Sequence, residues 1–177
     1  MIRVASQFTF CSPEKILRRM VVEIDELNAL TRLVDLDTHN AEPANTLFYD
    51  GILSAGIISV KQNKLPDKNA QLLLNYNYIK VTDQLLNKNI KSGTKPLLFD
   101  FNTDSVIEIN RHLKHLTPAL TEFSIFEIIA ACTYYPALLL NKPAPLSGNS
   151  QTGLILWEEV DLVNKRITEH TRIRLIR

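Results

Sequence analysis

Strand-like patterns occupy both ends of this chain, and they constrain its fold more than any other feature. Residues 2–50 are rich in β-branched and aromatic side chains separated by polar ones. Residues 172–176 alternate arginine with apolar side chains, as an edge strand of a half-buried sheet does. Neither set can bury both its edges and its apolar face alone. We therefore expect residues 154–176 to pair with strands from the first 50 residues.

The N-terminal part divides into strands and turns. Residues 16–22 predict one strand because they are apolar and β-branched, and residues 25–29 offer turn chemistry before a strand at 30–36. Asp, Asn and Pro in residues 37–46 predict a loop, and a short strand is expected at 47–49.

The middle of the chain changes to a mixed pattern. A helix is expected at residues 66–74, which begin with proline, and a short strand at 78–81. Residues 87–96 contain Asn, Lys, Ser and Gly and predict a loop before a buried strand at 96–101. A further connector is expected at 141–150, which holds Pro, Gly and Ser.

Two helices are predicted after the buried strand. Apolar residues spaced through 106–116 indicate one helix that ends at Pro118. Ser124 and Glu127 have the spacing of a capping box, which predicts a second helix that ends close to Pro136.

These elements predict an α+β protein. We expect a β-sandwich-like domain made from residues 1–60 plus 150–177, with residues 61–149 as a small α/β insert. Hydrophobic residues make up 45% and charged residues 22% of the 177 residues, which is typical of a folded chain. One domain carrying a compact insert fits this length.

Charge and sequence segments exclude several classes of partner. The net charge of +1 gives no field that attracts nucleic acid or an anionic membrane. The start of the chain does not resemble a signal peptide, and no segment reaches the roughly 18 apolar residues that span a bilayer. We expect a cytoplasmic protein. Cys11 and Cys132 are far apart, which predicts reduced, buried thiols and no thiolate zinc site.

Three stretches, in the same order, resemble parts of the amidohydrolase superfamily. Residues 47–59 resemble the passage from the small β domain of that superfamily into its first barrel strand. Residues 101–105 contain a Thr-Asp-Ser triplet, and residues 124–140 an alanine-containing helix, as at the end of the barrel. Residues 152–176 resemble the closing strands that complete the β domain. The resemblance implies a composite β domain built from both chain ends.

The chain departs from that superfamily in length. The resemblance covers roughly residues 1–60 and 97–177. A (β/α)₈ barrel takes about 200 or more residues. Only residues 60–103 lie between Ser59 and Asp104, so most of the barrel is missing and the insert would be its remnant.

The metal ligands of the superfamily are also missing. Its His-x-His pair would fall at Lys61, Gln62 and Asn63, where a cation and two neutral amides bind a metal poorly. We expect no cofactor, no metal site, and less than one transition ion per isolated chain. Asp104 falls on the position of the last-strand aspartate, which acts in the superfamily as a proton shuttle or metal ligand. The simpler interpretation is that Asp104, or Ser105 beside it, caps the following helix.

Two histidines provide another candidate site. His112 and His115 are spaced to share a helix face and could offer two nitrogens to zinc. Arg111 and Lys114 lie between and beside them, which favours a solvated basic face instead.

The sequence therefore favours a non-catalytic, amidohydrolase-like binding module rather than an enzyme. The alternative is a hydrolase of altered chemistry in a new cleft around Asp104, with Lys61 and His112 or His115. Loss of the barrel would expose apolar surface, so we expect a homodimer or another protein partner. The large side chains expected at that interface are Phe123, Phe126, Tyr134 and Tyr135.

Overall fold

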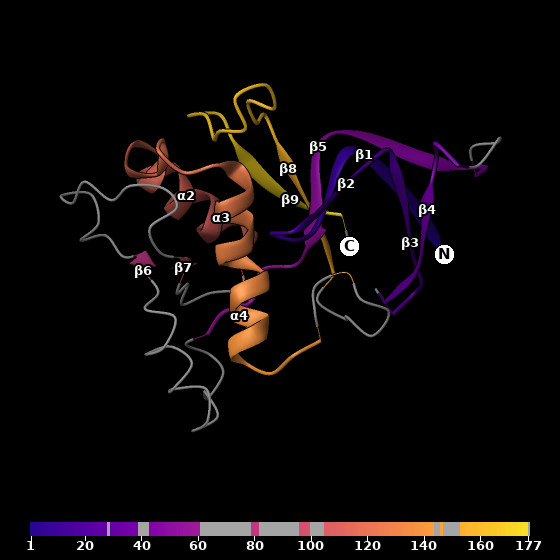
Figure 1. The fold of residues 1–177 in the computed structure, drawn as a ribbon, viewed down its shortest axis with the longest axis horizontal. Coiled ribbons are helices and arrows are strands. Elements are labelled where there is room, and N and C mark those ends of the chain that lie inside the picture. The colour runs from indigo at the N-terminus through magenta and orange to yellow at the C-terminus, as the bar shows by residue number, and fades with distance from the viewer. Residues whose placement is uncertain are drawn as a thin grey trace.

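The computed structural model describes residues 1–27, 29–38, 43–60, 79–81, 96–99, 105–143, 146 and 153–176. Seven strands form one sheet: β1 (Ile2–Ser12), β2 (Lys15–Arg18), β3 (Met20–Ile24), β4 (Leu30–Asp35), β5 (Thr46–Ala55), β8 (Leu154–Glu158) and β9 (Arg172–Leu175). Their order is β4-β3-β1-β5-β8-β9, with β2 also paired to β1. The helices α2, α3 and α4 gather on one side of this sheet (Figure 1). The chain is an α+β protein, as the sequence predicted.

The strand predicted at residues 16–22 is divided in two. Strands β2 and β3 lie end to end along the same side of β1, and both run antiparallel to it. Arg19 separates them with a φ of 51°, a left-handed conformation that an ordinary strand residue does not adopt. The carbonyl of Arg19 accepts a hydrogen bond from the Leu36 amide at 3.0 Å, and its guanidinium lies 2.9 Å from Asp37. Contacts from Leu36 and Asp37, which follow β4, therefore accompany the break between β2 and β3.

The turn between β3 and β4 is present where the sequence predicted it. Asp25 Oδ1 accepts hydrogen bonds from the backbone amides of Leu27 and Ala29, at 2.8 and 2.9 Å. An aspartate at this position satisfies the amides that a turn leaves unpaired. The two strands pair antiparallel from Ile24↔Leu30, beside the turn, to Met20↔Asp35.

Strand β5 is longer than the predicted strand at 47–49, and it connects the two ends of the chain. Its first part runs parallel to β1, and the register shifts between Ser6↔Tyr49 and Phe8↔Ile52. Two residues of β5, Asp50 and Gly51, therefore stand opposite one residue of β1, which is a β-bulge.

The predicted pairing between the chain ends is present, with β5 residues just beyond position 50. Strand β8 runs antiparallel to β5, with Trp157 opposite Ile52, and β9 pairs with β8 as the last strand of the sheet. The indole of Trp157 donates a hydrogen bond to Ser54 Oγ at 3.0 Å. A buried indole N–H needs such a partner, so this bond stabilises the pairing.

Helix α3 (Ile125–Cys132) begins with the predicted capping box. The Glu127 amide donates to Ser124 Oγ at 3.2 Å, and the Ser124 amide donates to Glu127 Oε2 at 2.8 Å. This exchange satisfies two amides at the start of the helix. Within the described residues, no helix is long and apolar enough to cross a membrane.

Two prolines do not end helices as predicted. Helix α2 (Val106–Leu120) continues past Pro118, because its last turn buries Leu120. Helix α3 ends earlier, at Cys132, and Pro136 lies in the first turn of α4 (Tyr134–Leu139). The first turn of a helix has amides without intrahelical partners, so proline costs little there.

Helices and sheet share one apolar core. This helix-side core joins sheet residues, among them Phe10, Ile52 and Trp157, with residues of α2 and α3 such as Ile109 and Ile128. A second core is formed mainly by sheet residues. Its buried members are Val4, Cys11, Val22, Ile24, Leu30, Leu53, Ala55, Leu146, Leu154 and Leu156.

The middle of the chain contributes a small parallel sheet. Strand β6 (Ile79–Val81) pairs with β7 (Leu97–Phe99), close to the strands predicted at 78–81 and 96–101. Phe99 belongs to the helix-side core. The helix predicted at 66–74 lies outside the described residues.

Thr9 is a buried polar residue whose hydroxyl can be tested by substitution. It is fully buried on β1, and within the described structure its hydroxyl has no hydrogen-bond partner. We expect Thr9→Val to raise the free energy of unfolding by about 1 kcal/mol, because valine removes the unpaired hydroxyl and keeps the shape. Urea unfolding measures this change.

A matched control is Thr133→Val. Thr133 is equally buried, but its hydroxyl donates to the Ile129 carbonyl at 2.8 Å. This second change should not stabilise the protein. If the two substitutions change the free energy of unfolding equally, the unpaired hydroxyl of Thr9 does not destabilise the protein.

Candidate functional site

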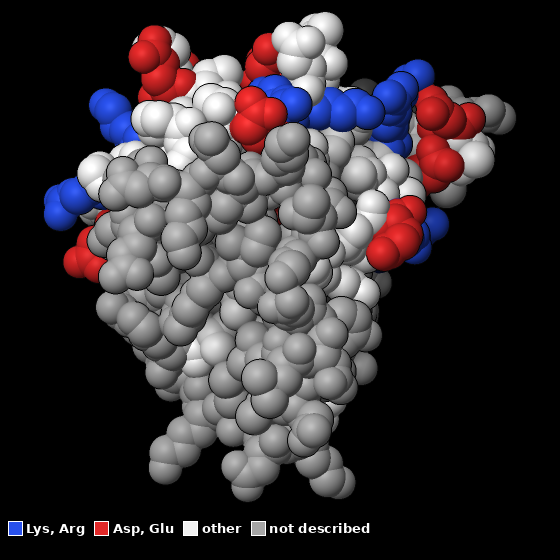
Figure 2. All heavy atoms as spheres, turned by 60° about the vertical axis from the view of Figure 1, so that its left-hand side comes forward, with Lys and Arg blue, Asp and Glu red and all other residues white. Residues whose placement is uncertain are grey.

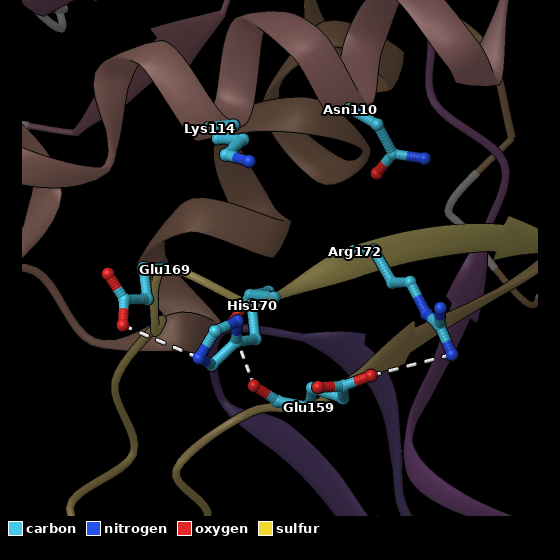
Figure 3. Close-up of a pocket in the computed structure, with 7 residues that line it drawn as sticks. Asn110, Lys114, Glu159, Glu169, His170 and Arg172 are labelled. Atoms are coloured by element: carbon cyan, nitrogen blue, oxygen red, sulfur yellow. Dashed lines mark hydrogen bonds and ion pairs between the residues drawn. The ribbon is translucent and has the colours of Figure 1, made fainter.

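A polar cleft lies between helix α2 and the strand β9 that follows the 168–171 turn (Figure 3). Its volume is about 310 Å³, which is at the lower end of the range for small-molecule sites. Figure 3 shows Lys114 and Asn110 projecting from α2 towards the segment that carries His170 and Arg172. The lining residues are Asn110, Lys114, Glu159, Glu169, His170, Thr171 and Arg172.

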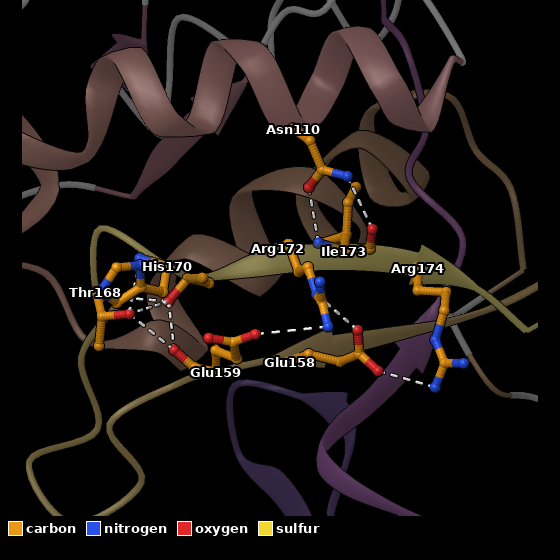
Figure 4. A network of polar contacts seen from close by, with 9 residues as sticks. Asn110, Glu158, Glu159, Thr168, His170, Arg172, Ile173 and Arg174 are labelled. Carbon is orange, nitrogen blue, oxygen red and sulfur yellow. Dashed lines mark hydrogen bonds and ion pairs between the residues drawn. The ribbon is translucent and has the colours of Figure 1, made fainter.

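Asn110 joins the two walls of the cleft. Its Nδ2 donates to the Ile173 carbonyl at 2.8 Å, and its Oδ1 accepts from the Ile173 amide at 2.7 Å (Figure 4). The amide side chain thus pairs with the outer edge of β9 as another strand would. Free strand edges invite pairing with other chains, so this contact also protects the edge of the sheet at Ile173.

The turn before β9 is fixed by hydroxyl groups. Thr168 Oγ1 and Thr171 Oγ1 both donate to the Glu159 carbonyl, at 2.8 and 3.0 Å. The Thr168 amide donates to Thr171 Oγ1 at 2.7 Å, and the His170 amide donates to Thr168 Oγ1 at 3.1 Å. The floor of the cleft is therefore held by a connected network, which limits the movement of His170.

The two arginines of β9, Arg172 and Arg174, form ion pairs. Arg172 lies 3.0 Å from Glu158 and 3.4 Å from Glu159, and Arg174 lies 2.8 Å from Glu158 (Figure 4). The guanidinium of Arg174 also covers the ring of Tyr49 at 4.8 Å. Both arginine side chains are exposed to solvent, at 60% and 47%, whereas Glu158 is only 16% exposed, and together these contacts orient the side chains at the rim.

The other charges of the cleft differ in whether they have a partner. His170 Nε2 lies 3.4 Å from Glu169 Oε1, with both side chains largely exposed. Lys114 forms no ion pair or hydrogen bond with the part of the chain that the structure describes. The cleft therefore has carboxylates that each contact a basic side chain, and one ammonium that contacts no carboxylate of the described residues.

Of the sequence-predicted site residues, those that the structure describes do not line this cleft. Ser105 is the N-cap residue of α2, but its side chain makes no capping hydrogen bond. His112 and His115 lie on the exposed part of α2 and do not line the cleft. Lys61 and Asp104 lie outside the described residues, so the alternative cleft around Asp104 stays a prediction.

The described residues include no group of three His, Cys, Asp or Glu that could hold a metal ion. Both cysteines are free and buried, as expected. Burial raises the pKa of the Cys132 thiol well above its ordinary value. For Cys11, burial raises the pKa and the charge of Lys15 opposes this effect. A thiol with a raised pKa is a poor nucleophile near neutral pH.

The candidate interface residues are partly used inside the molecule. Phe123 is only 2% exposed and lies in the helix-side core, so it is not available at the surface. Phe126 packs against Phe8 and Phe10, with ring centroids 5.9 and 6.4 Å apart. Tyr134 and Tyr135 are half-buried and contact each other edge to face at 5.5 Å.

Sequence reasoning missed the cleft because its walls come from distant segments. The sequence indicates a solvated basic face for Lys114 and an edge strand for Arg172. Each interpretation agrees with the exposure of that residue. The signal that was available is Asn110, a polar residue among the apolar positions of its helix.

Comparison with models of protein families, with curated protein sequences and with solved structures gave no match. The resemblance to amidohydrolases therefore stays a prediction, and the residues of the cleft are the basis for a proposed function.

The contact between Asn110 and Ile173 can be tested by substitution. We expect Asn110→Ala to lower the free energy of unfolding by about 2 kcal/mol, because it leaves a partly buried amide and carbonyl of Ile173 unpaired. Chemical unfolding measures the change. Arg111→Ala is the control, since Arg111 is an exposed neighbour on the same helix and should change stability by less than about 0.5 kcal/mol. Equal, small effects of both substitutions would contradict the role of Asn110.

Proposed function

We propose that this protein is a non-catalytic binding module and that its ligand site is the cleft between α2 and β9. The observation that carries the proposal is a hollow of about 310 Å³ lined by charged and polar side chains from two elements that Asn110 holds together. Binding groups on elements held in place in this way lose little freedom when a ligand arrives.

The chemistry of the lining favours binding over catalysis. The hydroxyl of Thr171 donates to the Glu159 carbonyl and accepts from the Thr168 amide, so it is used structurally rather than activated by a base. His170 and Glu169 are 70% and 82% exposed. Catalytic acids and bases usually work where water is excluded, whereas these two side chains remain exposed to water.

The proposal includes the finer features that the sequence predicted. In it the chain is an amidohydrolase-like protein that has lost most of its barrel, with a β-sandwich-like composite domain from residues 1–60 plus 150–177 and a cytoplasmic location. The pairing of β8 with β5 supports the composite domain. The shared helix-side core supports a remnant insert that packs on that domain.

Self-association is a second part of the proposal, on a different surface from the one first expected. The large exposed apolar side chains include Leu47 and Phe48 of β5, at 51% and 56% exposure, whereas Phe123 is buried. Light scattering during size exclusion measures the mass, and a 20.1 kDa species at micromolar concentration would show a monomer.

The binding function can be tested by NMR on the ¹⁵N-labelled full chain. A panel of small anions, cations and zwitterions should include members that shift the amides of residues 110–114 and 168–173, and the bound compound should be recovered chemically unchanged. If no member of the panel shifts these amides, or if the bound compound is converted to product, the proposal fails.

A further inference from the structure

The ligand class follows from which charged side chains of the cleft already have a partner, and this inference rests on the proposed binding function. We propose that the cleft binds a small organic anion, through a carboxylate or phosphate group held by the Lys114 ammonium.

Each carboxylate of the lining already contacts a basic side chain, of which His170 carries a charge only when it is protonated. Glu159 faces Arg172 at 3.4 Å, and Glu169 faces His170 at 3.4 Å. A cationic ligand would have to compete with these side chains for each carboxylate. The acidic groups are therefore poor candidates for the main ligand contact.

Lys114 is the basic side chain of the lining that lacks such a contact among the described residues. Figure 3 shows it on α2, facing His170 across the hollow. An ammonium with three donors forms charge-assisted hydrogen bonds with carboxylate or phosphate oxygens. An anion placed beside Lys114 would pair with its ammonium without breaking an existing contact of the lining.

Size and surrounding charge limit which anion fits. The volume of about 310 Å³ suits a small molecule. Glu158, Glu159 and Glu169 lie around the rim, and they would repel the repeated phosphates of a nucleic acid. On the face drawn in Figure 2, the described residues place Lys and Arg beside Asp and Glu rather than in a wide basic area. A single anionic group on a small organic molecule meets less of that repulsion than a chain of phosphates does.

The inference is tested by titrating the ¹⁵N-labelled full chain with succinate, inorganic phosphate and 1,4-diaminobutane. We expect succinate or phosphate to shift the amides of residues 110–114 and 168–173 and to saturate. The anion that binds more tightly tells whether a carboxylate or a phosphate group is preferred. In Lys114→Met the dissociation constant should rise about tenfold, as expected for loss of a charge-assisted hydrogen bond. Lys114→Arg should retain most of the affinity.

Lys142→Met is the matched control, since Lys142 is exposed and lies outside the cleft. It should leave the affinity unchanged, and circular dichroism should show that all three variants are folded. Binding of diaminobutane but of neither anion would overturn the anion assignment while the binding function stands. Anion binding with the same affinity in Lys114→Met would overturn the role of Lys114. Absence of any shift at the cleft with every compound in the wider panel would overturn both proposals.

Discussion

Gly51→Ala is expected to destabilise the protein by at least about 3 kcal/mol and to leave much of it unfolded or insoluble. Gly51 lies in the β5 bulge with a φ of 129°, a backbone conformation that residues with a Cβ atom rarely adopt. A Cβ atom added there would lie 2.1 Å from the Trp157 carbonyl oxygen. Since both atoms belong to the paired strands β5 and β8, neither can move away without breaking the ladder that joins the chain ends.

The control for this substitution is Asp50→Ala. Asp50 occupies the same bulge and is exposed, so its replacement should change stability by less than about 0.5 kcal/mol. Thermal and urea unfolding compare the two variants. A Gly51→Ala protein as stable as the parent would show that the bulge can rearrange and that the close approach of the two strands is not required.

Deletion of residues 150–177 is expected to leave a chain that does not fold. The deletion removes Ile155, Trp157 and Ile173 from the helix-side core, and Leu154 and Leu156 from the second core. Burial of one such side chain contributes about 1.5–3 kcal/mol. Five of them together match the whole stability of an ordinary domain, about 5–15 kcal/mol.

Co-expression of the missing segment provides the control for the deletion. If the loss is only that of strands β8 and β9, residues 150–177 supplied as a separate chain should restore soluble protein. The readouts are solubility and the dispersion of the amide NMR spectrum. A stable, dispersed fragment of residues 1–149 alone would contradict the conclusion that both chain ends build one sheet.

The helix caps and turns could be predicted because their determinants are local. The capping box of Ser124 and Glu127 and the turn at Asp25 depend on residues within a few positions of each other. The same is true of the buried strand β7, whose three residues are all apolar. In these elements, the side chains that determine the backbone conformation lie within the same short segment.

Features that depend on contacts across the sheet were missed. The break at Arg19 and the bulge at Asp50 and Gly51 arise where β1 is paired on both sides, and the residue types do not indicate a left-handed arginine. Pro118 and Pro136 were expected to end helices, but burial of Leu120 and the position of Pro136 in a first turn decided otherwise.

The sequence by itself determined the α+β class, the strands at both chain ends and the helix that Ser124 begins. These follow from periodicity and from short-range hydrogen bonding, which each segment carries within itself. Only the tertiary structure decided where the polar cleft lies. Asn110 and Lys114 meet Arg172 across a cleft because the pairing of β8 with β5 brings β9 beside α2. No local pattern records this proximity, since it results from the packing of segments that lie far apart in the chain.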